Sequence, residues 1–177
     1  FRIPNLLRDL FAEGALSTAF VPTYVRTLRR DGRPAAYALA NRVLTTLTLY
    51  LGALAMLAMI FPDPVVRVVA KGFSSDQAAL TALLVRIMMP FLPAISLAVV
   101  AMGALNAEEK YTAPALASSM FNVVAIVGGA VVWLLGTGPR WVVITWASLT
   151  LLGGVAQLAV QVPSLWGRGF RPRFRPD

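Results

Sequence analysis

Four long stretches of this sequence contain no charged residue, and they constrain the fold more than any other feature. They are Val43–Pro62, Ile87–Ala107, Tyr111–Pro139 and Trp141–Gly167. Each is long enough for an α-helix that crosses a bilayer core, which takes about 20 apolar residues. The Gly136–Pro139 turn separates the last two stretches, and the prolines in Phe61–Pro64 end the first. The pattern predicts a helical protein that crosses a membrane several times.

The composition supports this class and excludes others. Hydrophobic residues make up 58% of the 177 residues, and charged residues only 14%, against about one quarter in soluble domains. The chain has no cysteine and no histidine, so we expect no disulfide, no metal site and no cofactor. Nothing in the spacing of the remaining residues resembles an enzyme motif, and we expect no catalytic residues. The net charge is +8. The arginines cluster beside apolar runs, which favours membrane topology over nucleic-acid binding.

The first 28 residues predict a fifth span, although this stretch contains charges. On a helical wheel, Arg2, Asn5, Arg8, Asp9 and Glu13 fall within one half of the helix, and the other half is apolar. A charge at the bilayer centre costs about 2.5–3.5 kcal/mol on insertion scales. The polar half must therefore face protein or water, as in a helix that lines a hydrated cavity. Arg8 is then a candidate for binding an anionic substrate, or part of an ion-pair lock with the acidic residues.

We predict an all-α bundle over residues 1–167, with helices at about 4–28, 37–61, 77–106, 112–135 and 141–166, and a basic tail over 168–177. The positive-inside rule sets the orientation. Most basic residues flank the first and third connections or lie in the tail: Arg26, Arg29, Arg30, Arg33, Arg42, Lys110, Arg168, Arg171, Arg173 and Arg175. That side is predicted to be cytoplasmic, with the tail on anionic lipid.

Several shorter features give local expectations. Residues 63–77 form either a short interfacial helix beginning at Pro64 or a plain loop. Pro90 and Pro93 should kink the helix predicted over residues 77–106. Hydrogen bonds between helices are expected at Ser118, Ser119 and Asn122, and close helix packing at four glycines. These are Gly128, Gly129, Gly153 and Gly154, and Arg86 is expected to anchor the outer end of its helix.

The stretch Arg2–Pro22, "RIPNLLRDLFAEGALSTAFVP", closely resembles the second transmembrane helix of the MurJ (MviN) family of lipid II flippases, within the MOP exporter superfamily. "AKGF" at 70–73, residues 90–123 and "QLAVQVPSL" at 157–165 resemble later parts of the same family. The resemblance covers nearly the whole chain. Its Pro-Asn-Leu-Leu-Arg and Phe-Ala-Glu-Gly-Ala elements are its most specific part.

The resemblance implies the first lobe of a MOP-type (MATE-like) flippase fold in the bacterial cytoplasmic membrane. The family moves the undecaprenyl-diphosphate-linked peptidoglycan precursor across that membrane by alternating access. By resemblance, Arg8 contacts the diphosphate, and Glu13 and Asn5 line the same cavity. Asp9 stands where many relatives have a basic residue, which leaves its role open.

The family has fourteen helices, and this chain matches helices two to six, so we expect a fragment that is inactive without the missing helices of the same protein. Its other partners are the precursor and membrane lipids. Two alternatives remain: a related MOP exporter of polysaccharide-lipid or drugs, and a non-transporting membrane scaffold subunit in which the charges act as structural locks.

Overall fold

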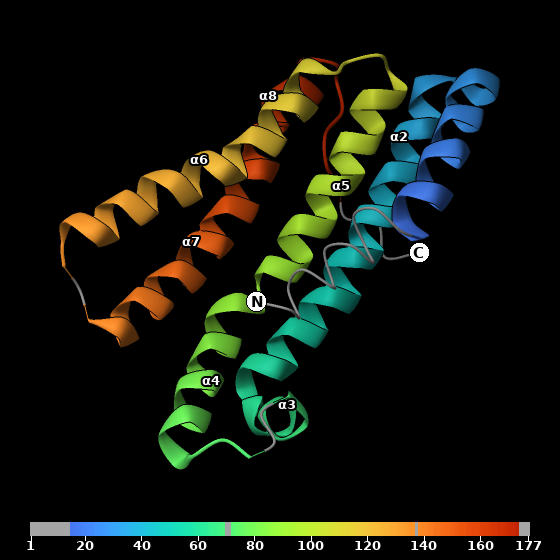
Figure 1. Ribbon diagram of the computed structural model, residues 1–177. Coiled ribbons are helices and arrows are strands. Elements are labelled where there is room, and N and C mark those ends of the chain that lie inside the picture. Colours follow the sequence, from blue (N-terminus) through green and yellow to red (C-terminus); the bar gives the residue numbers. More distant parts are fainter. Residues whose placement is uncertain (1–14, 70–71, 137, 174–177) are drawn as a thin grey trace.

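The computed structural model describes residues 15–69, 72–136 and 138–173 (Figure 1). This part of the chain folds entirely into α-helices and short connections. The helices are α2 (Ala15–Ile60), α3 (Pro62–Val69), α4 (Ser75–Met88), α5 (Phe91–Ala107), α6 (Thr112–Leu134), α7 (Pro139–Ala159) and α8 (Val162–Trp166). Among the described residues, four segments are long and apolar enough to cross a membrane: Thr18–Ile60, Ser75–Ala107, Thr112–Leu134 and Pro139–Trp166. The prediction of an all-α, multi-spanning membrane protein is confirmed.

α2 is two helices joined at one residue, Gly32. Gly32 has φ 81° and ψ 177°, a backbone conformation that is essentially restricted to glycine. Pro34 follows within the first turn of the second helix, where its missing N–H costs nothing. The chain turns back here, so that the first part of α2 lies beside the second (Figure 1). Phe20 and Tyr24 from the first part share one buried cluster with Ala36 and Ala40 from the second.

α3 settles the alternative left open for residues 63–77, because the segment begins as a helix. It starts at Pro62, with Asp63 in its first turn and Arg67 in its last. An acidic residue in the first turn and a basic residue in the last turn both interact favourably with the helix dipole. α4 then starts with a capping box, in which the Ser74 hydroxyl accepts from Gln77 N at 3.4 Å. The Gln77 side chain accepts from Ser74 N at 3.0 Å.

The expected proline kink divides the helix predicted over residues 77–106 into α4 and α5. α4 ends at Met88 and α5 begins at Phe91, with Pro90 at the break. Pro90 has no N–H to continue the helical ladder. Arg86, in the last turn of α4, donates from Nε to the Met59 carbonyl of α2 at 3.2 Å. Arg86 therefore ties the end of α4 to the end of α2.

α5 is the centre of the bundle and contributes more buried residues than any other described helix. It packs against both α2 and α7, while α6 pairs with α7 in a hairpin at the side of the bundle (Figure 1). Gln161, at the α7–α8 junction, is fully buried and donates to the Ala98 carbonyl of α5 at 3.2 Å. This hydrogen bond fixes the junction on α5.

Glycines permit the close helix contacts that the sequence predicts. A Cβ on Gly153 would lie 2.7 Å from the Phe121 ring, and one on Gly154 would lie 2.6 Å from the Phe91 ring. A Cβ on Gly128 would overlap the Leu149 side chain. The expectation for the serines is wrong, because Ser118 and Ser119 donate to the carbonyls of Pro114 and Ala115 in their own helix. A hydroxyl that finds an acceptor four residues earlier needs no neighbouring helix.

Candidate functional site

The predicted substrate-binding residues, Asn5, Arg8 and Glu13, lie outside the described residues, as does Asp9. Their proposed roles therefore remain predictions. The described structure places a different polar site at the end of the bundle where α2 turns at Gly32 and α5 connects to α6. α8 and the C-terminal segment meet at the same end (Figure 1).

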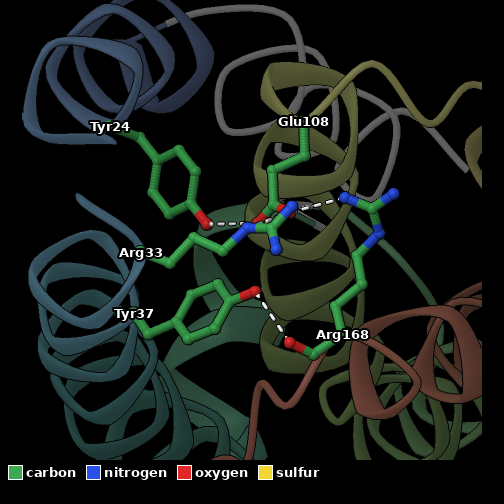
Figure 2. A network of polar contacts seen from close by, with 5 residues as sticks. All are labelled: Tyr24, Arg33, Tyr37, Glu108 and Arg168. Atoms are coloured by element: carbon green, nitrogen blue, oxygen red, sulfur yellow. Dashed lines mark hydrogen bonds and ion pairs between the residues drawn. The ribbon is translucent and has the colours of Figure 1, made fainter. Parts of the chain in front are cut away.

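Glu108 is the centre of this site, which we call the Glu108 cluster: Tyr24, Arg33, Tyr37, Glu108 and Arg168 (Figure 2). Tyr24 donates from Oη to Glu108 Oε1 at 3.1 Å. Arg168 donates from Nη1 to Glu108 Oε2 at 2.5 Å, and Arg33 Nε lies 3.6 Å from the same oxygen. One carboxylate thus joins the first part of α2, the second part of α2, and the segment that follows α8.

Burial differs among the three charged members of the cluster. The Glu108 side chain is 5% exposed and that of Arg168 is 18% exposed, whereas Arg33 is 61% exposed. Removing one partner of a buried pair costs about 3–5 kcal/mol, because the other charge stays desolvated, but an exposed pair contributes about 1 kcal/mol or less. Arg168 is therefore the main counter-charge of Glu108, and Arg33 is a secondary one.

The backbone after α5 directs Glu108 into the bundle. Glu108 caps α5, and Glu109 has a positive φ of 60°. Lys110 N donates to the Leu105 carbonyl at 2.9 Å, which closes the left-handed cap that usually has glycine at this position. The chain reverses within these residues, so that Glu108 is turned inward while Glu109 is exposed.

Side chains of α2 hold the C-terminal segment by hydrogen bonds to its main chain. Tyr37 donates from Oη to the Arg168 carbonyl at 3.2 Å. The Asn41 amide donates to the Arg171 carbonyl at 3.3 Å and accepts from Arg173 N at 3.0 Å. Phe170 is buried, and its ring lies edge-on to Tyr37 with centroids 5.3 Å apart. Residues 168–173 are thus part of the folded bundle, although the sequence predicts a separate basic tail on lipid.

Sequence reasoning missed the Glu108 cluster. It assigned Arg33 and Arg168 to membrane topology and gave no role to Glu108 or Tyr24. A signal was present, because Glu108 and Glu109 are acidic residues in a connection on the arginine-rich side. In the described ranges, no group of three potential metal ligands comes together. With its carboxylate contacted by two guanidinium groups and a phenol, the cluster is suited to holding helix ends together.

These features define a multi-spanning α-helical membrane protein whose arginine-rich end is held by a buried ion pair. Comparison of the sequence with known protein families and proteins identifies the family. The family model described as "Lipid II flippase MurJ" matches residues 1–177. The chain belongs to the MurJ lipid II flippase family, a family of transporters rather than enzymes.

Individual relatives agree with this assignment. The lipid II flippase MurJ of Burkholderia cenocepacia is 38% identical over 167 residues, which cover 93% of this chain and 32% of that protein. The probable lipid II flippase MurJ of Rhizobium meliloti is 33% identical over 178 residues, 99% of this chain and 33% of the relative. That of Bdellovibrio bacteriovorus is 32% identical over 182 residues, with 99% and 34% covered. The chain spans about a third of the length of these relatives.

Proposed function

We propose that this chain forms helices of the first lobe of a flippase for lipid II, the undecaprenyl-diphosphate-linked peptidoglycan precursor, in the bacterial cytoplasmic membrane. The observation that carries the proposal is the family match over residues 1–177. The proposed bundle has five membrane spans, and the first covers about residues 4–28. The described part of this span begins with α2 at Ala15. The arginine-rich end, with the Glu108 cluster, faces the cytoplasm.

Arg8 is proposed as the substrate contact within the membrane. A guanidinium gives paired, charge-assisted hydrogen bonds to phosphate oxygens, and an arginine at membrane depth is retained only where it faces protein or water. Glu13 and Asn5 share the polar half of the same predicted helix and are proposed to line the cavity. Alternating access moves one lobe against another around such a site, so transport requires the rest of the protein.

The Glu108 cluster supports a mechanical role in this cycle. A lobe that moves as a unit needs its helix ends to keep their positions while the cavity opens and closes. The cluster connects α2, the α5–α6 connection and the C-terminal segment through one buried carboxylate. We propose that it makes this end of the bundle a rigid body.

The test is growth of a flippase-depleted strain that expresses the full-length protein. Arg8→Ala should abolish complementation at normal protein levels, because the diphosphate loses its paired donors. Arg140→Ala is the control, since Arg140 is an exposed arginine in the first turn of α7, on the opposite side of the membrane by the predicted topology. Normal growth of the Arg8→Ala strain would remove the substrate-contact role and favour the scaffold alternative.

A further inference from the structure

α3 joins two membrane spans at the end of the bundle opposite the Glu108 cluster (Figure 1). Figure 1 shows α3 nearly end-on, whereas α2 and α4 run along the plane of the picture, so α3 lies crosswise to both. It packs against α4 and the end of α2. Pro62 and Val66 are four residues apart, which places them on one side of the helix, and both are buried. α3 thus lies across the end of the bundle, at the level where the spans leave the membrane.

The other sides of α3 separate apolar from charged residues. Pro64 and Val68, again four residues apart, form an exposed apolar row, and Val68 is 75% exposed. Asp63 and Arg67 form an exposed charged row. Val65, about half a turn around the helix from the charged row, is partly buried. A short helix with its charges confined to one side is typical of helices that lie in a membrane interface.

The apolar row of α3 follows directly on an exposed apolar surface of α2. Met56, Ile60 and Phe61 are each more than half exposed, and they belong to the uncharged run Val43–Pro62. α2 is long and apolar enough to cross the membrane, so its exposed apolar residues lie at the level of the acyl chains. The exposed row of α3 therefore begins where this surface reaches the edge of the membrane.

We propose that α3 lies in the plane of the membrane interface, with Pro64 and Val68 among the acyl chains and the charged row toward the headgroups and water. The partner is the phospholipid surface. Within the described residues, neither Asp63 nor Arg67 forms an ion pair, so the Arg67 guanidinium is available to lipid phosphates. Since α3 connects α2 to α4, its position in the interface sets the height of both spans relative to the lipid.

The inference rests on the proposed function only for the choice of leaflet. With the arginine-rich end facing the cytoplasm, α3 lies in the outer leaflet.

The test places a nitroxide spin label on single cysteines of the full-length protein in vesicles of phosphatidylethanolamine and phosphatidylglycerol. Power saturation compares collisions with oxygen, which concentrates among acyl chains, and with a water-soluble nickel complex. A label at Val68→Cys should collide mainly with oxygen, and one at Arg67→Cys mainly with the nickel complex. Asp63→Cys is the matched control, because Asp63 shares the charged row and should behave as Arg67 does. All three positions are exposed, so the labels should not disturb the core.

Two results would overturn the proposal. If the label at Val68 collides with the nickel complex as often as the label at Arg67, α3 lies in water above the membrane. If neither reagent reaches Val68, another part of the full-length protein covers the apolar row.

The leaflet is tested separately, with an impermeant thiol reagent on intact cells. Arg67→Cys should be labelled, whereas labelling only after the cells are opened would overturn the outer-leaflet assignment together with the orientation in the proposed function.

The two proposals fail in different ways. If Arg8→Ala abolishes complementation while Val68 is reached by the nickel complex, the interfacial position of α3 is wrong and the transport function stands. If the Arg8→Ala strain grows normally while Val68 collides mainly with oxygen, the substrate-contact role is wrong and the interfacial helix stands.

Discussion

Arg168 Nη1 lies 2.5 Å from Glu108 Oε2, and this pair joins two segments that are 60 residues apart in the sequence. Both side chains are largely buried. The pair fixes the segment after α8 to the connection between α5 and α6, and Tyr24 brings α2 to the same carboxylate. A single side chain therefore determines how three parts of the arginine-rich end meet.

Glu108→Gln should destabilise the protein by about 3 kcal/mol, because the buried Arg168 guanidinium loses its counter-charge. The measurement is the Tm of the full-length protein in detergent. Glu109→Gln is the control, since Glu109 is the exposed neighbour in the same turn. Equal Tm values for the two variants would show that Glu108 does not hold this end together.

Two glycines of α2 should respond in opposite directions to the same substitution. Gly32→Ala should cost about 1–3 kcal/mol, because φ 81° with ψ 177° is a conformation that a Cβ makes strained. Gly52→Ala should be neutral or stabilise by up to about 1 kcal/mol, since Gly52 lies inside the helix with no atom within 4 Å of an added Cβ. Both are read from Tm. A stable Gly32→Ala variant would contradict the turn at this residue.

Helix packing predicts a second contrast, between α7 and α6. Gly154→Ala should cost about 1–3 kcal/mol, because the new methyl group would lie 2.6 Å from the Phe91 ring in the core. Gly129→Ala should change stability by less than about 1 kcal/mol, since its nearest neighbour, the Trp146 ring, lies at 3.5 Å. Thermal unfolding of both variants checks the contrast. A Gly154→Ala protein as stable as Gly129→Ala would mean that α5 and α7 are farther apart than described.

The proposed topology predicts which positions an impermeant thiol reagent can reach in intact cells. A cysteine at Ser75, at the start of α4, should be labelled, and one at Asp31 should be shielded until the cells are opened. Asp31 is suited to labelling because it is exposed and lies beside Gly32, so that the substitution leaves the special backbone of the turn intact. Since the chain itself lacks cysteine, its own residues give no background. Reversed labelling would reverse the orientation.

Much of the fold could be predicted from local patterns. The uncharged runs predicted the helices, and Pro90 predicted the break between α4 and α5. The glycines of α6 and α7 predicted close packing. These features depend on length, hydropathy and backbone conformation, which neighbouring residues determine. The single-residue turn at Gly32 was not predicted, because the composition around it suggests a longer connection.

The sequence by itself determined that this chain crosses a membrane, and its motifs indicated the family that the comparisons then confirmed. It also singled out Arg8 through the cost of placing a charge in lipid, and that role stays a prediction. Only the tertiary structure decided which charges are paired. Glu108, Arg168 and Tyr24 are far apart in the chain, and their contact depends on how three helix ends come together. Ion pairing is decided by distance and burial, and neither can be read from the order of residues.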